Sequence, residues 1–307
     1  MKVAVIGIGS NSVRMLQAEV GGGQFERLRR DREGTRLFAG LDAAGNLTEK
    51  SMRKTADAVR RMAEDAWGNG CERLHIFATS ASRDARNGTF FLDMLRRETG
   101  VEPRILSGEE EACLSFLGAT DVAGGERCGM MDIGGGSTEL VFGRGETIET
   151  ALSCQIGAVR LFQQLPIALP KDMETVEAEA ARILEQKLEC LQGCSVPEIW
   201  VGTGGTFTAL GAIVCGVHWT DRTRLHGTEI SQTDARQIGT LLAGMTVEDR
   251  LRIPGLQPQR ADIVVHGICI LLAAMERLGI QRIRVSEFGN LDGFLRKYEM
   301  NEKGLPS

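Results

Sequence analysis

The sequence predicts an α/β protein of two domains that contains an internal duplication. Its 307 residues are enough for two domains. Apolar strand-like runs alternate with segments of helical periodicity, which is typical of α/β layers. An apolar run, a turn of small residues and a second apolar run occur twice, at residues 3–16 and 128–142. We therefore expect one domain at residues 1–120 and a second at 121–290, with a C-terminal helix at about 291–307 that packs back on the first.

Each expected element has a local reason in the sequence. Residues 2–20 have the pattern of a hairpin, and the glycines at 21–23 turn the chain into another strand. Thr48 fits a helix N-cap, and apolar residues from Met52 to Ala66 keep helical spacing. The other expected strands are 74–78, 101–106, 146–152, 199–201 and 283–285. The other expected helices are 89–99, which Gly100 should end, and 109–117, 171–192, 231–244, 259–278 and 293–298.

The turn between Asp132 and Glu139 carries the strongest functional signal. Three consecutive glycines, Gly134, Gly135 and Gly136, allow backbone N–H groups to approach a ligand closely. A ring of such donors favours an anion, usually phosphate. Carboxylates beside a phosphate repel it unless a cation or an activated water requires them. No Gly-Lys-Ser/Thr follows and a strand comes next, so neither a P-loop nor a dinucleotide fingerprint fits.

Two further turns resemble this one. When Asp132 to Ser137 is laid over Gly7 to Ser12, the isoleucine, the next glycine and the final serine coincide. Gly7 then stands opposite Asp132. A third turn, Gly202 to Thr206, follows an expected strand and opens a helix, an arrangement that also favours phosphate. The two matching hairpins suggest a phosphate chain held between the halves of the molecule.

Two more segments carry candidate chemistry. Arg83 and Arg86 follow the strand that ends near residue 78, where they either hold phosphates or form a solvated pair with Asp84. Three glutamates, at residues 109–111, lie shortly after Ser107. Capping of a helix N-terminus explains the serine and one glutamate, and the role of a general base that activates water explains another.

Other charged side chains have simpler explanations. We expect the arginine run at residues 27–36 to be a solvated face, except for Arg36. The four histidines lack the spacing of metal ligands, and His266 is expected to be a hydrogen-bonded core residue.

Composition limits the function classes and the location. Hydrophobic residues make up 42% of the chain and charged residues 25%, which is ordinary for a soluble globular protein. The net charge of −5 argues against a nucleic-acid partner. The apolar stretch 263–275 is too short to span a bilayer, so we expect no membrane partner. Eight cysteines without a Cys-x-x-Cys pair, and no signal peptide, predict a reduced, cytoplasmic protein.

Several motifs in order resemble the exopolyphosphatase/guanosine pentaphosphate phosphohydrolase (Ppx/GppA) family. They are Gly9-Ser10-Asn11-Ser12, Arg36-Leu37, Ala78-Thr79-Ser80-Ala81-x-Arg83-Asp84-Ala85-x-Asn87, Ser107-Gly108-x-Glu110-Glu111-Ala112, Asp132-x-Gly134-Gly135-Gly136-Ser137-x-Glu139, Gly204-Gly205-Thr206 and Arg260-Ala261-Asp262. The resemblance covers nearly the whole chain and matches the short form, without a C-terminal HD-type domain. It implies an actin-like, duplicated fold with a cleft between ribonuclease-H-like halves.

The resemblance also implies roles for individual residues. Glu111 resembles the catalytic base for water, with Glu110 as a less favoured substitute, and Arg83 resembles a phosphate-contacting arginine that assists catalysis. Asp132 and Glu139 resemble acids that hold Mg²⁺ or another divalent cation. The phosphate-binding residues implied are Ser10, Asn11, Ser12, Gly134, Gly135, Gly136, Ser137, Gly204, Gly205 and Thr206. The implied reaction is attack of water on the terminal phosphorus of polyphosphate or of guanosine pentaphosphate (pppGpp), and dimers are common in the family, so a homodimer is one expectation.

Two positions depart from the family pattern. The family usually has Asp where this chain has Gly7, and it tends to have Arg where this chain has Leu291. The missing acid leaves open a second interpretation, a polyphosphate or (p)ppGpp-binding regulator with weak or no turnover. A third is an actin-like kinase of a small molecule, because fold alone does not fix function.

Overall fold

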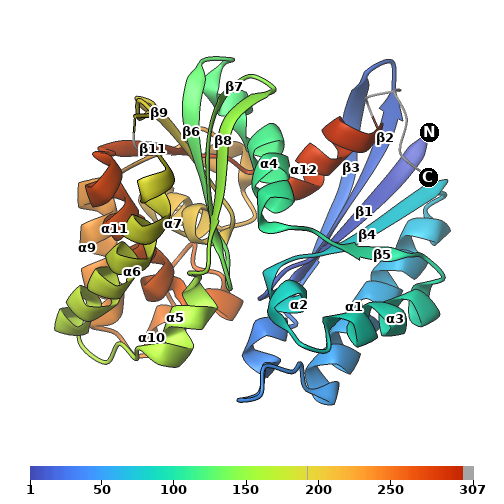
Figure 1. Ribbon diagram of the computed structural model, residues 1–307, viewed down its shortest axis with the longest axis horizontal. Coiled ribbons are helices and arrows are strands. Elements are labelled where there is room, and N and C mark those ends of the chain that lie inside the picture. Colours follow the sequence, from blue (N-terminus) through green and yellow to red (C-terminus); the bar gives the residue numbers. More distant parts are fainter. Residues whose placement is uncertain (192, 300–307) are drawn as a thin grey trace. The chain divides into compact units, whose positions relative to one another are not determined.

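The computed structural model describes residues 1–191 and 193–299, and its chain divides into two compact units (Figure 1). Among the described residues, unit 1 comprises 1–118 and 290–299, and unit 2 comprises 119–191 and 193–289. The last residue of the predicted helix 171–192, and the predicted C-terminal helix beyond residue 299, lie outside the described residues.

Unit 1 is built on a five-stranded mixed sheet with the strand order β3-β2-β1-β4-β5. Its strands are β1 (Lys2–Ile8), β2 (Val13–Gly21), β3 (Gln24–Glu33), β4 (Arg73–Ala78) and β5 (Pro103–Ile105). The first three strands are antiparallel, whereas β4 runs parallel to β1 and β5 runs parallel to β4. Because β1 and β4 are parallel, the turn after β1 and the end of β4 lie at the same edge of the sheet.

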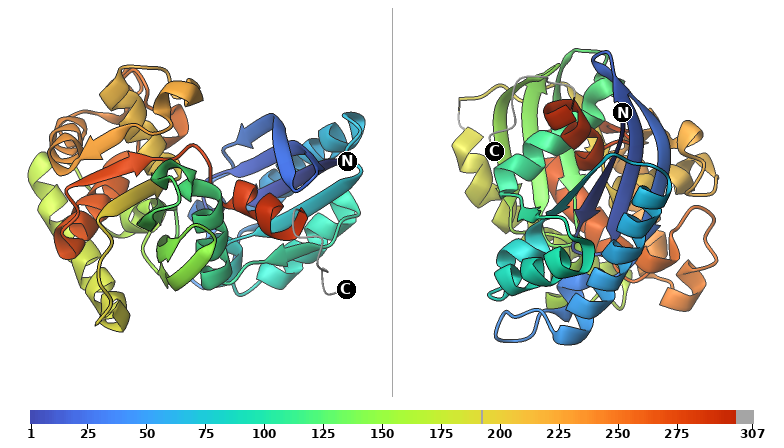
Figure 2. Two further views of the ribbon diagram at one scale, coloured as in Figure 1. Left: turned by 90° about the horizontal axis from the view of Figure 1, so that it is seen from above. Right: turned by 90° about the vertical axis from the view of Figure 1, so that its right-hand side faces the viewer.

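Helices cover both faces of this sheet. On one face lie α1 (Glu49–Gly68) and α3 (Gly88–Thr99); Thr48 caps α1 and Gly100 ends α3 in the left-handed conformation, as their sequences predict. On the other face, α4 (Gly108–Ala119) and α12 (Asn290–Phe294) enclose an apolar cluster, and α12 brings the C-terminal part of the chain back to β1 and β2 (Figure 2). The π-helical turn Leu295–Glu299 continues α12, and the short elements of unit 1 are Leu37–Gly40 and α2 (Ser80–Asp84).

Unit 2 repeats the same plan with a six-stranded sheet of order β10-β11-β9-β6-β7-β8. Its strands are β6 (Arg127–Ile133), β7 (Thr138–Arg144), β8 (Thr147–Cys154), β9 (Ile199–Thr203), β10 (Glu229–Ser231) and β11 (Arg282–Val285). Its longer helices are α5 (Ala158–Gln164), α6 (Met173–Leu188), α7 (Gly205–Cys215), α9 (Gln232–Ala243) and α11 (Val264–Leu278), which share one large apolar core with the sheet. The short helices α8 (Arg222–Leu225) and α10 (Val247–Arg250) complete it.

The duplication predicted from the two hairpins is present in the structure. In both units a hairpin is followed by a third antiparallel strand and then by a strand parallel to the first. Gly7 pairs with Arg14 across the first hairpin as Asp132 pairs with Glu139 across the second. Even the irregularity between the second and third strands recurs, at Gln17/Ala18 and at Phe142/Gly143, which correspond by the same offset.

Some predicted boundaries were wrong. The predicted helix at 259–278 begins only at Val264, because Pro258 starts a separate 3₁₀ turn, Pro258–Arg260.

No helix within residues 1–191 and 193–299 is both long and apolar enough to cross a membrane. All eight cysteines are free thiols; four are buried, and Cys190 and Cys194 are exposed.

His266 is a core residue of α11, as predicted. It is 2% exposed, and its Nε2 donates to the carbonyl of Leu165 at 2.8 Å. Burial lowers the pKa of the imidazole below its ordinary value of 6.5, although the bond to the carbonyl opposes this shift. The unfolded chain therefore binds a proton that the folded chain excludes, so His266 reduces the free energy of unfolding as the pH falls below 6.5.

We expect His266→Gln, which keeps a donor for Leu165, to flatten this dependence. The measurement is urea unfolding at a series of pH values from 6.5 downward. His218→Gln, which changes an exposed histidine, is the matched control and should leave the dependence unchanged. Equal pH profiles for the His266 variant and the unaltered protein would contradict the assignment.

Candidate phosphate-binding turns and acidic residues

The turn of the first hairpin is closed by one backbone hydrogen bond and backed by the segment before α1. The N–H of Gly9 donates to the carbonyl of Ser12 at 3.0 Å. The carbonyls of Ser10 and Asn11 accept the N–H groups of Phe38 and Arg36, at 2.9 and 3.0 Å. These carbonyls are thereby occupied, which removes the acceptors that would repel an anion.

Arg36 reaches this turn in a strained conformation. Its φ is 57°, and among the described residues it is the one non-glycine residue with positive φ. A left-handed non-glycine residue costs about 1–3 kcal/mol and concentrates at functional sites. In this conformation the N–H of Arg36 donates to the carbonyl of Asn11.

The turn of the second hairpin has the same bond and the same backing. The N–H of Gly134 donates to the carbonyl of Ser137 at 2.9 Å, and the first N–H groups of α5 bind the carbonyls of Gly134 and Gly135. Gly157 must lack a side chain, because a Cβ there would overlap the backbone of Gly135. Within the described chain, the N–H groups of residues 135–137 donate to no backbone acceptor, which leaves a row of donors for an anion.

Asp132 and Glu139 face each other across the second hairpin. They are direct partners in the β6–β7 register, so their side chains share one face of the sheet. Both are buried, at 8% and 1% exposure, and Glu139 accepts a hydrogen bond from the Ser153 hydroxyl at 2.9 Å. Like charges directly opposite each other destabilise a sheet. A buried pair of carboxylates is also the kind of donor set that divalent cations use.

The third turn lies against the same acid. Thr203 pairs with Asp132 in the β9–β6 register, and the Asp132 carboxylate occupies the space that a Cβ of Gly204 would need. The guanidinium of Arg260 likewise lies where a side chain at Gly205 would project. At the start of α7, the hydroxyl of Thr206 is buried and has no hydrogen-bond partner within residues 1–191 and 193–299. Unit 2 thus combines two carboxylates, an arginine and a helix N-terminus suited to an anion.

The three glutamates at the start of α4 have different surroundings. Glu109 is exposed. Glu110 forms a capping box with Ser107 and an ion pair with Arg104, so chemistry at the start of the helix accounts for it. Glu111 is buried, at 8% exposure. Burial therefore singles out Glu111 from the three.

Glu111 and Arg83 are in contact within unit 1. The Arg83 Nη1 lies 3.2 Å from a carboxylate oxygen of Glu111 and donates to the carbonyl of Leu106 at 2.9 Å. The Nη2 of Arg83 is buried and makes no hydrogen bond within the described part of the chain. The arginine can orient the carboxylate through one nitrogen and bind a further anion through the other.

The sequence did not predict the contacts of two residues near the first turn, and one of them, Arg32, was assigned to the solvated arginine face. The hydroxyl of Ser80 lies 2.8 Å from that of Ser10, because Ser80 follows β4 at the edge where the β1 turn lies. Arg32 donates through Nε to the Ser12 hydroxyl at 3.3 Å. The parallel pairing of the two strands could have signalled Ser80, whereas no local pattern signals Arg32.

The prediction of a solvated arginine face was wrong for Arg27 and Arg30. Arg27 and Arg30 both bind Asp292 of α12 at 2.6 Å, and Asp292 is almost fully buried. Arg29 alone of this set points to the other face, where it pairs with Asp31 and Asp65. The prediction failed because the partner, Asp292, is more than 260 residues away in the sequence.

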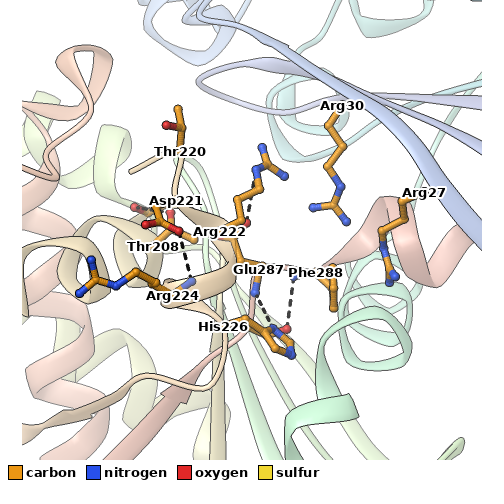
Figure 3. Close-up of polar contacts among 12 residues, drawn as sticks. Arg27, Arg30, Thr208, Thr220, Asp221, Arg222, Arg224, His226, Glu287 and Phe288 are labelled. Carbon is orange, nitrogen blue, oxygen red and sulfur yellow. Dashed lines mark hydrogen bonds and ion pairs between the residues drawn. The ribbon is translucent and has the colours of Figure 1, made fainter. Parts of the chain in front are cut away.

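Unit 2 has a second polar cluster, around His226 (Figure 3). The ring accepts the N–H of Glu287 at 3.4 Å, and its Nε2 lies 3.6 Å from Asp121. Arg222 pairs with the Glu287 carboxylate at 3.5 Å.

Across residues 1–191 and 193–299, no group of three or more His, Cys, Asp or Glu side chains could hold a metal ion. A cation site in this part of the chain would therefore have at most two ligands of these four residue types.

Comparison with known proteins decides the family. The sequence profile of the Ppx/GppA phosphatase family matches residues 16–302. The chain belongs to the Ppx/GppA phosphatase family. Exopolyphosphatase 2 of Mycobacterium tuberculosis is 33% identical over 310 residues, which cover 95% of this chain and 97% of that protein. Exopolyphosphatase 1 of Mycobacterium bovis is 32% identical over 317 residues, which cover 99% and 90%.

Solved structures of Ppx/GppA proteins share the fold. An exopolyphosphatase-like protein superposes with a TM-score of 0.89 at 28% identity, over 97% of this chain and 98% of that one. The PPX-GPPA enzyme of Aquifex aeolicus gives a TM-score of 0.78 at 28% identity, over 96% and 99%. The duplicated two-unit α/β fold predicted from the sequence is thereby confirmed.

Proposed function

We propose that this protein hydrolyses the terminal phosphoanhydride bond of inorganic polyphosphate. The observation that carries the proposal is the buried Asp132–Glu139 pair beside a glycine turn whose N–H groups are available to an anion. Family membership and the exopolyphosphatase names of the relatives support the substrate. The terminal phosphates of pppGpp offer the same chemical group, so we propose pppGpp as a second substrate.

The donor set of the acidic pair fits Mg²⁺. Carboxylate oxygens are its preferred protein ligands, and Mg²⁺ is usually held by one or two carboxylates, with waters and substrate phosphates completing the shell. Asp132 and Glu139 would hold the ion. When bound, it would polarise a phosphoryl oxygen and offset negative charge in the transition state.

The protein groups supply binding and proton transfer. Backbone N–H groups of residues 135–137 and the N-terminus of α7 bind phosphate oxygens. Glu111 accepts a proton from the attacking water, and the Arg83 contact holds its carboxylate in position. The leaving phosphate chain departs with its own negative charge, which the remaining donors stabilise.

A binding protein with weak turnover is the second candidate. Gly7 stands at the position that corresponds to Asp132, and a Cβ there would lie 2.9 Å from Leu291 and 3.1 Å from Phe77. The first hairpin therefore contributes no acid at this position. If an acid at residue 7 were essential for hydrolysis, tight binding of polyphosphate would persist without turnover.

A substrate panel tests these alternatives. Phosphate release from long-chain polyphosphate, pppGpp and ATP is measured with Mg²⁺ and with EDTA. We expect release from polyphosphate that requires the metal, and its loss in Asp132→Asn. Tight polyphosphate binding by calorimetry without release would favour the binding protein, and ATP-dependent phosphorylation of a small molecule without bulk phosphate release would favour a kinase.

A further inference from the structure

We propose that Ser80 is a positioning residue for substrate binding at the turn of residues 9–12. Its hydroxyl donates to the hydroxyl of Ser10, so that Ser10 donates its own proton to a phosphate oxygen of the substrate. The inference rests on the proposed function, because it assigns part of the phosphate chain to this turn. Ser80 acts through Ser10 and does not itself touch the substrate.

The parallel pairing of β1 and β4 brings the two serines together. Ile8 and Ala78 are partners at the ends of these strands, and the N–H of Thr79 donates to the carbonyl of Ile8 at 3.0 Å. The segments that follow the two strands therefore lie side by side. The hydroxyls of Ser10 and Ser80 are 2.8 Å apart, and both residues are buried, at 4% and 2% exposure.

The pair of hydroxyls has one more proton than it uses. Each hydroxyl carries one proton and two lone pairs. One proton makes the bond between Ser10 and Ser80, and the other has no acceptor within residues 1–191 and 193–299. A buried donor without an acceptor is costly, and such groups are rare in folded proteins. The second proton is therefore available to an acceptor that a ligand supplies.

An anion suits this position. Besides its hydroxyl, Ser10 offers a backbone N–H that donates to no backbone acceptor in the described chain, whereas its carbonyl accepts the N–H of Phe38 at 2.9 Å. An ionised phosphate oxygen only accepts, and its hydrogen bonds are stronger than those between neutral groups. When Ser10 donates to such an oxygen, Ser80 must be the donor within the pair. The two bonds then polarise each other.

Ser82 provides a matched control on the same short helix, α2. It is 1% exposed, so its burial resembles that of Ser80. Its hydroxyl makes no hydrogen bond within the described part of the chain, to Ser10 or to any other residue. Ser82→Ala therefore removes a buried hydroxyl from α2 without removing a contact to the turn.

Loss of the Ser80 hydroxyl should weaken substrate binding. The Ser10 hydroxyl loses the donor that orients it, and the loss of one neutral hydrogen bond corresponds to a rise in KM of about two- to tenfold. The contact to phosphate is the same in the ground state and the transition state, so kcat should not change. Ser80→Cys fills nearly the same space with a weak donor, so it should also raise KM.

The experiment compares Ser80→Ala and Ser80→Cys with Ser82→Ala. Steady-state kcat and KM are measured with long-chain polyphosphate, and thermal unfolding monitors the fold. We expect both Ser80 variants, and not the Ser82 variant, to raise KM. Equal KM in Ser80→Ala and Ser82→Ala, or a fall in kcat with KM unchanged, would overturn the proposal.

A double variant tests whether Ser80 acts through Ser10. If it does, Ser80→Ala should raise KM in the unaltered protein and have no further effect in the Ser10→Ala background. A further rise of KM in that background would show that Ser80 binds substrate independently, and would contradict the positioning role.

A binding measurement separates this inference from the proposed function. Calorimetry with tripolyphosphate needs no turnover. If the protein releases no phosphate from any substrate, the hydrolase proposal fails. Weaker tripolyphosphate binding by Ser80→Ala than by Ser82→Ala would still support the role of Ser80, and equal binding would contradict it.

Discussion

Glu111→Ala is expected to lower kcat for phosphate release from polyphosphate by about 10²–10⁴-fold, the usual contribution of a general base. The substitution removes the buried carboxylate that Arg83 contacts at 3.2 Å. It leaves the phosphate turns unaltered, so KM should change little. The measurement is steady-state phosphate release at saturating polyphosphate with Mg²⁺.

The neighbouring glutamates provide matched controls on the same helical turn. Glu109→Ala changes an exposed residue and should have no effect. Glu110→Ala breaks the capping box with Ser107, so it should lower the free energy of unfolding by about 1 kcal/mol and leave kcat unchanged. A larger loss of kcat in Glu110→Ala than in Glu111→Ala would reverse the assignment of the base.

Arg83 distinguishes a positioning role from substrate binding. If it acts only through Glu111, then Arg83→Gln in the Glu111→Ala background should have no further effect. If its second nitrogen binds phosphate, the same change should raise KM in both backgrounds. The buried, unpartnered Nη2 favours the second outcome.

Sequence reasoning succeeded where the cause is local. The Thr48 and Gly100 caps depend on a few adjacent residues, and both are present. The correspondence of the two hairpins needed only an aligned pattern of glycine and serine. In both turns the N–H of the glycine donates to the carbonyl of the serine three residues later, from Gly9 to Ser12 and from Gly134 to Ser137.

Sequence reasoning failed where the cause is a distant partner. Nothing near β3 shows that Asp292 binds Arg27 and Arg30. The opposition of Arg14 and Arg32 depends on a register that includes an irregularity at Gln17/Ala18, and a shift of one residue would have put Arg32 on the other face. The partners of Arg27 and Arg30, and the face on which Arg32 lies, therefore depend on long-range pairing that local sequence patterns do not predict.

Gly7→Asp tests the largest departure from the family pattern. Restoring the acid is expected to destabilise the protein and not to raise phosphate release. A Cβ at residue 7 would lie 2.9 Å from the Leu291 side chain and 3.1 Å from the Phe77 ring, closer than ordinary contact. Overpacking costs about 1–3 kcal/mol. The carboxylate would also enter an apolar cluster that contains Leu114 and Phe294, where an ion is further penalised.

Urea unfolding of Gly7→Asp measures this loss. Gly21→Asp is the matched control, because a Cβ at Gly21 meets nothing within 4 Å and the free energy of unfolding should change little. A Gly7→Asp variant as stable as the control would show that the packing at residue 7 yields easily. A gain in phosphate release would show instead that the missing acid limits the chemistry.

The double variant Gly7→Asp/Leu291→Ala separates packing from charge. Leu291→Ala alone should lower the free energy of unfolding by about 2–5 kcal/mol, because Leu291 is 8% exposed in the cluster. In the double variant the new carboxylate gains space and faces Arg14, its direct cross-strand partner. The two losses should then sum to more than the loss of the double variant, with a coupling of about 0.5–3 kcal/mol.

Such coupling would mean that the two departures from the family pattern, at Gly7 and at Leu291, depend on each other. Where unit 2 has Asp132, unit 1 has Gly7, and Gly7 packs against Leu291 of α12. An acid at residue 7 would bring its Cβ within 2.9 Å of a Leu291 methyl group, so one of the two side chains would have to shift. The duplicated hairpins have therefore diverged in chemistry while their backbone hydrogen bonds remained the same.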